Sequence, residues 1–386
     1  MKILFLNPCP EKQSKNHLFR KFYSQINSAV KLGDDVYYTS YDEQFLFINH
    51  IQNGQIKQQI LGKNKYKERN VLIMHQMMQS LRNWIKKDCI DLVYMRNIPP
   101  TYAHSKTKKM LQEAGAKICI EIPSYPGNEI NLSSRKFYFK LVSIAYKLFS
   151  TPSYTNLYAL IGEHADTYQG VAAINIENGL DVETIPLKNG FSDHPGEIHL
   201  LIVAVVQYWH GYDRLIKGID NYIRNIGDVK IMLHICGSCH DGSLDSLLQF
   251  AREHGFSDNV IFHGYQSGKD LDSIFDKCDV AIGSLGLHRS KIIIDTTLKL
   301  PEYTARGIPF IYCTTSNNVK PDGKYYLRIP DDETDVDIQA LVKFFHSINK
   351  KTVITEMREY AENNIQWSVQ LTKVKNKIKE MEKNNG

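Results

Sequence analysis

Long hydrophobic runs are missing from the sequence, and this excludes proteins that cross a membrane as helices. The longest run, Leu200–Val206, has the length of a buried strand, whereas a membrane-spanning helix needs about 20 apolar residues. The apolar segment after Met1 ends at Pro8 and Pro10, too early for the apolar core of a secretory signal, which takes about 7–15 residues. We therefore expect a cytoplasmic protein.

A strong charge imbalance and a metal-ligand pattern are also missing. The formal charge of +5 over 386 residues is too small to indicate nucleic-acid binding. The seven cysteines are an odd, scattered set, which indicates reduced thiols. Cys236 and Cys239 form one CxxC pair, but no second pair exists to complete a structural zinc site. The expected strand ends carry no DxD motif and no cluster of histidine and carboxylate, so we expect neither a metal nor another cofactor.

The patterning that is present indicates an α/β fold. Strands alternate with helices along most of the chain, which favours parallel sheets with helices on both faces. The polar stretch 42–70 is consistent with either a hairpin or an inserted loop. In the first half we expect strands at Lys2–Asn7, Asp35–Tyr41, Asp91–Asn97, Lys117–Pro123 and Ala172–Asn178, and helices at Asn16–Gly33, Val71–Cys89 and His104–Gly115.

The alternation restarts at His199, which indicates a second domain. The segment Pro186–Glu197 is rich in proline and glycine and is typical of a linker. We expect an N-terminal acceptor-binding domain over 1–188, a donor domain over 189–365, and a C-terminal helix over 366–386 that returns to the first domain. The second half is expected to hold strands at Leu200–Val206, Lys230–Gly237, Asn259–Gly264, Asp279–Gly286 and Pro309–Thr315, and helices at Tyr212–Ile226, Ser243–His254, Lys269–Lys277 and Thr296–Arg306.

The carboxyl ends of the second set of strands carry a group of residues suited to an anion. Ligands of open α/β sheets bind at this edge. After Asp279–Gly286, a loop with Arg289 leads to a helix expected to open with Asp295, Thr296 and Thr297, and helix N-termini offer free N–H groups to phosphate. Arg289 and Lys299 would add positive charge, and Glu302 on the same helix could accept hydrogen bonds from ribose hydroxyls.

These segments resemble glycosyltransferase family 4. The run Leu298–Pro309 resembles the LK-x-x-E-Y-x-A-x-G-x-P segment of that family. The resemblance covers nearly the whole chain and is most specific from Ile202 to Tyr312. Further matches, in the expected order, are Glu121–Pro126 (a segment of capsule and exopolysaccharide members), Asn178–Asp181 (NGID turn), Trp209–Ile216 (KG-x-x-x-LI turn), Ile235–Gly237 (strand end) and Val260–Gly264 (strand before the base pocket).

The resemblance implies a GT-B fold, in which two Rossmann-like domains with parallel sheets face a central cleft. It also implies a retaining, metal-independent hexosyltransferase that uses a nucleotide-sugar donor. The resemblance implies that Glu302, Arg289 and Lys299 take part in catalysis. As donor-binding residues it implies His210, Gly211, Tyr265, Ser284, Asp295, Thr296, Thr297 and Leu298, and as acceptor-binding residues Arg96, Glu121, Ser124 and Tyr125.

Two departures from the family pattern weaken parts of this prediction. Ile294 stands where the family has the first glutamate of its E-x7-E motif, and Asp295 is one residue out of register. The arginine–lysine pair that holds the diphosphate is also missing. His210 stands in place of the lysine, and Val205 or Val206 in place of the arginine.

We predict that the acceptor is a lipid-linked saccharide and that the protein acts in surface-polysaccharide synthesis. The segment Ser134–Phe149 has four basic residues among large apolar ones, and no acidic residue occurs between Ile130 and Gly162. Such a helix can lie on an anionic membrane, here the inner face of the cell membrane, or pack as an ordinary domain helix. Two other functions on the same fold stay open: a nucleotide-sugar 2-epimerase and a non-catalytic partner subunit.

Overall fold

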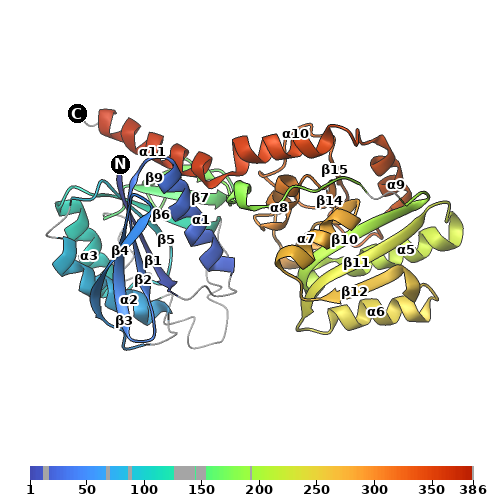
Figure 1. Cartoon of the computed structure of the whole chain (residues 1–386), viewed down its shortest axis with the longest axis horizontal. Coiled ribbons are helices and arrows are strands. Elements are labelled where there is room, and N and C mark those ends of the chain that lie inside the picture. Colours follow the sequence, from blue (N-terminus) through green and yellow to red (C-terminus); the bar gives the residue numbers. More distant parts are fainter. Residues whose placement is uncertain are drawn as a thin grey trace. The chain divides into compact units, whose positions relative to one another are not determined.

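The structure is a computed structural model that describes residues 1–11, 17–66, 70–85, 89–125, 144, 154–191 and 194–384. The chain divides into two compact units (Figure 1). Unit 1 comprises Met1–Asp181 and Trp367–Gly386, and unit 2 comprises Val182–Gln366. The units divide after residue 181, whereas the sequence placed the boundary after residue 188.

The described part of unit 1 contains a nine-stranded sheet in the order β4-β3-β2-β1-β5-β6-β7-β9-β8. Neighbouring strands are parallel except for the pairs β2/β3, β3/β4 and β8/β9. The described sheet of unit 1 is therefore mixed, with parallel strands in the middle and antiparallel strands at both edges. The strands are β1 (Lys2–Pro10), β2 (Asp35–Tyr41), β3 (Phe45–Gln52), β4 (Gln55–Lys63), β5 (Leu92–Arg96), β6 (Lys117–Tyr125), β7 (Leu157–Gly162), β8 (Thr167–Tyr168) and β9 (Val171–Ile176).

Strand β1 shows why helices cover both faces of this sheet. Its side chains alternate between faces, as strand geometry requires. Ile3 and Phe5 join a core with the helices α1 and α11, and Leu4 and Leu6 join another with α2 and α3. The helices of unit 1 are α1 (His17–Lys31), α2 (Asn70–Ile85), α3 (Tyr102–Glu113) and α11 (Trp367–Asn384).

The polar stretch after β2 forms a hairpin, the first of the two alternatives that the sequence left open. Gln52 pairs with Gln55 across the turn, and Asn53 and Gly54 have φ angles of 50° and 75°. Two central residues with positive φ are the mark of a type I′ turn, for which Asn-Gly is the preferred sequence. The antiparallel strands β3 and β4 follow directly from this dipeptide.

Unit 2 contains a parallel sheet whose described strands run in the order β12-β11-β10-β13-β14-β15. Strand β10 is a nearly continuous apolar run because helices cover both faces of such a sheet. The strands are β10 (Glu197–Val206), β11 (Lys230–Cys239), β12 (Val260–Gly264), β13 (Val280–Ile282), β14 (Phe310–Tyr312) and β15 (Tyr326–Arg328).

Helix α5 is typical of the helices in unit 2. Its buried residues include Tyr212, Leu215, Ile216 and Ile219, the spacing that places one apolar stripe on a core. The helices are α5 (Tyr212–Asn225), α6 (Ser243–Glu253), α7 (Gly268–Lys277), α8 (Lys299–Arg306), α9 (Ile338–Ser347) and α10 (Val353–Tyr360), and the short turns are η2 (Val182–Thr184), η3 (Tyr208–His210), η4 (Ser257–Asn259), η5 (Leu287–Ser290) and η6 (Ala361–Ile365).

The C-terminal helix α11 packs against α1 and β9 of unit 1. Its first residue, Trp367, is fully buried and donates its backbone N–H to the Leu180 carbonyl at 3.0 Å. Further along, Lys375 forms an ion pair of 2.6 Å with the buried carboxylate of Asp34. These contacts fix the last helix to the first unit.

The segment 134–149, predicted to contact a membrane, lies outside the described residues apart from Ile144. Among the helices that the structure does describe, none is long and apolar enough to cross a bilayer.

Candidate functional site

The order of strands in unit 2 identifies one edge of the sheet as the place for a ligand. The chain moves outward from β10 to β11 and β12 on one side, and from β13 to β14 and β15 on the other. Loops therefore diverge at the carboxyl ends of β10 and β13, which pair in parallel. In doubly wound sheets this reversal point opens a crevice that holds the ligand.

The two loops at the reversal point meet through their backbones. The loop after β10 forms the turn η3 and ends at Gly211, and the loop after β13 runs through Leu285 and Gly286. The Leu285 N–H donates to the His210 carbonyl at 2.7 Å. A Cβ atom on Gly211 would lie 2.6 Å from the Gly286 nitrogen, and Gly211 has φ of 69°. Glycine is therefore required at position 211 by both the space and the backbone conformation.

We predict that Gly211→Ala separates these two loops. The new methyl group would meet backbone atoms, which cannot move aside as a flexible side chain can. We expect thermal unfolding to show that the free energy of unfolding falls by about 2–4 kcal/mol, because the strained φ and the clash both destabilise the variant. Calorimetric titration should show weakened nucleotide binding.

Gly255→Ala is the matched control for this substitution. Gly255 also has positive φ, at 78°, but a Cβ atom there would meet nothing within 4 Å. Gly255→Ala should lower the free energy of unfolding by only about 1–2 kcal/mol, the cost of the left-handed backbone conformation. If the two alanine variants were equally stable and bound nucleotide alike, the close approach of the loops would have no functional importance.

His210 acts at this site as a neutral hydrogen-bond donor. Its ring is buried between Trp209, with ring centroids 3.8 Å apart, and Tyr212, at 5.2 Å. Burial, followed by the nearby charge of Lys299, lowers the pKa of His210 to about 3. The Gln207 N–H donates to Nδ1 at 3.1 Å, so the proton of the neutral ring lies on Nε2. His210 therefore supplies an N–H group at neutral pH and no positive charge.

Lys299 supplies the cation at the centre of the group. Its Nζ lies 3.1 Å from the Tyr212 hydroxyl and 3.5 Å from the Ser284 hydroxyl. Burial lowers the pKa of Lys299 to about 7, and the carboxylate of Asp295 partly opposes this shift. A bound diphosphate would favour the charged form of the lysine.

The turn before α8 differs from the prediction, which began this helix at Thr296. The helix begins at Lys299, and Asp295 accepts the Thr297 N–H at 2.8 Å. The Asp295 N–H donates to the Thr315 carbonyl at 2.7 Å, so the backbone here is tied to the segment after β14. Asp295, Thr296, Thr297 and Leu298 therefore form a turn beside Lys299. The buried Thr297 hydroxyl has no hydrogen-bond partner among the described residues.

Arg289 does not fit the diphosphate role expected for it. Its guanidinium forms a bidentate pair with Asp213, at 2.7 and 2.9 Å, and another with Glu333, at 2.9 and 2.5 Å. It also donates to the Tyr208 carbonyl at 2.8 Å and lies 4.3 Å from the Tyr208 ring centroid. An arginine has five N–H donors, and these contacts use all of them. Arg289 fastens η5 to η3 and α5, a role that single-sequence spacing could not reveal.

Glu302 lies on α8, three residues after Lys299, and its carboxylate contacts Arg306. It accepts a hydrogen bond of 2.9 Å from Arg306, which also pairs with Asp272 at 2.8 Å. The Arg306 guanidinium lies 4.1 Å from the Phe275 ring centroid. About a third of the Glu302 side chain stays exposed, so it remains accessible to a ligand.

The structure thus places all but one of the expected donor residues in one group, and leaves Tyr265 apart. His210, Gly211, Ser284, Lys299 and the turn 295–298 lie around the reversal point. Tyr265 is an exposed residue just after β12, the edge strand of the sheet. Tyr212, whose hydroxyl contacts Lys299, was not predicted, although its place directly after Trp209-His210-Gly211 could have suggested it.

The expected acceptor residues in unit 1 separate in a similar way. Glu121 is buried on β6, where it pairs with Lys21 at 2.7 Å and Arg96 at 3.7 Å. Its neighbours Ile120 and Ile122 instead line a pocket on the other face of the sheet. Glu121 therefore anchors cations and does not face the pocket. These cations lower the pKa of Glu121 against the opposing effect of burial.

The other residues predicted to bind the acceptor either lie near the same pocket or are not described by the structure. Arg96 lines the pocket, and its side chain is 24% exposed. The Tyr125 ring packs edge-on against Tyr168, which also lines the pocket, with centroids 5.5 Å apart. The Ser124 side chain lies outside the described residues. His104 and Lys108 also line this pocket and were not predicted as site residues.

Residues 188–291 match the family model described as glycosyl transferases group 1. The matched segment begins before β10 and ends after η5, so it includes both strands of the reversal point. No curated protein matches the chain.

Several solved glycosyltransferase structures share the architecture. A glycosyltransferase from Rickettsia africae is 13% identical over 99% of both chains, with a TM-score of 0.61. Anabaena HepE, solved in complex with UDP, is 12% identical over 98% of this chain and 100% of its own, with a TM-score of 0.58. Sucrose-phosphate synthase from Thermosynechococcus elongatus is 12% identical over 97% of this chain and 98% of its own, with a TM-score of 0.60.

These similarities confirm the expected fold, GT-B, with its two Rossmann-like units. Together, the family match and the fold support a glycosyltransferase of the group 1 type.

Proposed function

We propose that the chain is a retaining glycosyltransferase that moves a hexose-type sugar from a nucleotide-sugar to a saccharide acceptor. The observation that carries the proposal is the group around Lys299 at the β10/β13 reversal point, beside the segment that matches the group 1 family model. A cation, a neutral N–H donor and two hydroxyl groups converge there. UDP in the Anabaena structure supports the choice of a nucleotide-sugar as donor.

In the proposed reaction, the donor diphosphate lies against Lys299, the Nε2–H of His210 and the first N–H groups of α5. The bond from the sugar C1 to the diphosphate oxygen breaks, and its electron pair stays on the diphosphate. The acceptor oxygen forms its bond to C1 on the same face, and its proton passes to the leaving diphosphate. Lys299 then acts by stabilising developing negative charge, and no metal takes part.

The predicted stereochemistry and metal independence can be measured in one assay. We expect proton NMR to show a product, or slowly hydrolysed sugar, that keeps the donor's anomeric configuration when first formed. The rate should be unchanged in EDTA. An inverted product would rule out the retaining mechanism, and activity lost in EDTA but restored by manganese would rule out metal independence.

A second candidate function is a donor-binding partner subunit without turnover. Two observations favour it: Ile294 replaces a family glutamate, and all five N–H groups of Arg289 are used within the protein. The NMR assay separates the functions, because a subunit of this kind would bind donor without releasing sugar. Isomerised donor in the absence of acceptor would instead identify a 2-epimerase.

We further propose that the acceptor is a lipid-linked saccharide of surface-polysaccharide synthesis, reached from the inner face of the membrane. The segment 134–149 supports this through its composition alone. Each Lys or Arg near an anionic surface contributes about 1 kcal/mol. We predict that the chain sediments with anionic vesicles at low salt, and that changing Arg135, Lys136, Lys140 and Lys147 to glutamine releases it.

A control variant removes four exposed lysines elsewhere, Lys57, Lys109, Lys217 and Lys291, and so changes the net charge equally. It should still sediment with the vesicles. A wild-type chain that stays in the supernatant would contradict peripheral binding, and equal release of both variants would show that binding follows net charge alone.

A further inference from the structure

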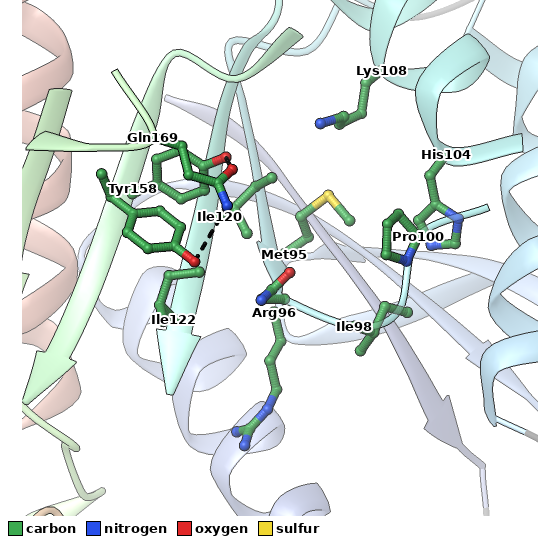
Figure 2. A pocket seen from close by; sticks show the side chains of 12 residues that line it. Met95, Arg96, Ile98, Pro100, His104, Lys108, Ile120, Ile122, Tyr158 and Gln169 are labelled. Carbon is green, nitrogen blue, oxygen red and sulfur yellow. Dashed lines mark hydrogen bonds between the residues drawn. The ribbon is translucent and has the colours of Figure 1, made fainter. Parts of the chain in front are cut away.

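A second polar site lies within unit 1, at the carboxyl ends of β5 and β6 (Figure 2). The pocket there has an apolar side, which includes Ile120 and Ile122, and a side formed by α3 and the loop before it. Lys108 reaches from α3 into the space between these sides in Figure 2. Parallel strands of α/β units bind their ligands at this edge.

His104, in the first turn of α3, lines the pocket and has an unused hydrogen-bond donor. The Thr101 N–H donates to Nδ1 of His104 at 3.1 Å, and burial lowers the pKa of His104 to about 3. The ring is therefore neutral, and its proton lies on Nε2. This Nε2 atom is buried in a residue only 2% exposed, and it has no partner among the described residues. Buried donors are nearly always paired, so a ligand oxygen is the natural complement.

One cation, Lys108, reaches into the same pocket. Lys108 lies one helical turn beyond His104 and is 5% exposed, and burial lowers its pKa to about 8. The Arg96 guanidinium points away from Lys108 in Figure 2 and lies 3.7 Å from Glu121, on the other face of the sheet. A buried lysine is stabilised in its charged form by a nearby anion.

We propose that this pocket binds an oxyanion of the acceptor, a phosphate or a carboxylate, through Lys108 and the Nε2–H of His104. The inference rests on the proposed function, because it takes the pocket to be the acceptor site of a glycosyltransferase. Tyr158 and Tyr168, whose ring centroids lie 4.9 Å apart, form an aromatic wall for the uncharged part of the acceptor. An acidic sugar and a lipid diphosphate share this chemistry.

Calorimetric titration of the purified full chain tests the proposal with three probes at matched ionic strength. Inorganic phosphate reports the oxyanion alone, geranyl diphosphate a lipid diphosphate, and glucuronate an acidic sugar. Glucose and geraniol are the neutral controls. We expect at least one anion to bind while its neutral counterpart does not. Lys108→Met should weaken that binding about tenfold or more, the effect of one lost charge-assisted hydrogen bond.

Lys109→Met is the matched control, because it removes the same charge from an exposed position on α3. It should bind the anions as wild type does. Lys108→Arg, which keeps the charge, should retain part of the binding that methionine removes. If only geranyl diphosphate binds, the acceptor anion is a lipid diphosphate. If only glucuronate binds, it is the carboxylate of an acidic sugar.

The proposal is overturned if wild type binds none of the three anions, or if Lys108→Met binds them as tightly as wild type. Nucleotide titration of the same samples keeps the two proposals apart. Nucleotide binding without anion binding contradicts only the acceptor pocket, whereas anion binding without nucleotide binding contradicts the proposed donor site.

Discussion

Replacing Lys299 by methionine is expected to slow sugar transfer by about 10²–10³-fold, the usual effect of removing one preorganised group that stabilises a developing oxyanion. Lys299 is held between Tyr212 and Ser284, and its charge has the buried carboxylate of Asp295 nearby. Steady-state kinetics should show the loss mainly in kcat, because charge on the diphosphate develops as the C1–oxygen bond breaks.

Lys291→Met is the control for this prediction. Lys291 lies in the same connection between β13 and α8, is exposed, and carries the same charge. Its replacement should leave the rate within about twofold, since exposed charges are screened by solvent and salt. Equal rates in the two methionine variants would show that Lys299 has no role in transfer.

Glu302→Gln is expected to lower kcat/KM for the donor by about ten- to hundredfold, the value of one or two hydrogen bonds to a charged acceptor. The motive is the position of Glu302 in the segment that resembles family 4, together with its partly exposed carboxylate. The fold should stay intact, because Arg306 keeps its ion pair with Asp272.

Asp272→Asn removes the other carboxylate from the same arginine and is the matched control. Asp272 is 26% exposed and Glu302 is 34% exposed, so the two substitutions should change stability by similar, small amounts of about 1 kcal/mol or less. Only Glu302→Gln should change donor kinetics. If both variants lost activity equally, Glu302 would act only through Arg306.

The strand and helix pattern of unit 2 could be predicted because its signals are local. Apolar runs such as Leu200–Val206 give buried strands, and the stripe on α5 gives a packed helix. The start of α8 could not be predicted, because it depends on bonds from Asp295 to Thr315, a residue distant in sequence. The short β13 has the same cause: Leu285 leaves the sheet to bond the His210 carbonyl.

Unit 1 shows which signals were missed and which were absent. The dipeptide Asn53-Gly54 was sufficient to choose the hairpin, and with it the antiparallel part of the sheet. Strand β7 (Leu157–Gly162) was not predicted, although it is a fully buried apolar run. The extra strand lies between β6 and β9 in the sheet.

For the sites, residue types could be predicted but their partners could not. Arg289 and Lys299 look equivalent in sequence, yet the first is saturated by Asp213 and Glu333 while the second lies at the reversal point. Glu121 belongs to a segment that resembles the family, but strand alternation turns it away from the pocket that Ile120 and Ile122 line. Such distinctions depend on which face a residue occupies and on which charges lie across from it.

The most direct test of the central claim is a calorimetric titration with UDP, GDP, ADP, dTDP and CDP against wild type, Lys299→Met and Lys108→Met. We predict that wild type binds at least one of these nucleotides, that Lys299→Met weakens this binding about tenfold or more, and that Lys108→Met leaves it unchanged. Binding that is absent from wild type, or equal in wild type and Lys299→Met, would contradict a nucleotide-sugar site at the β10/β13 reversal point.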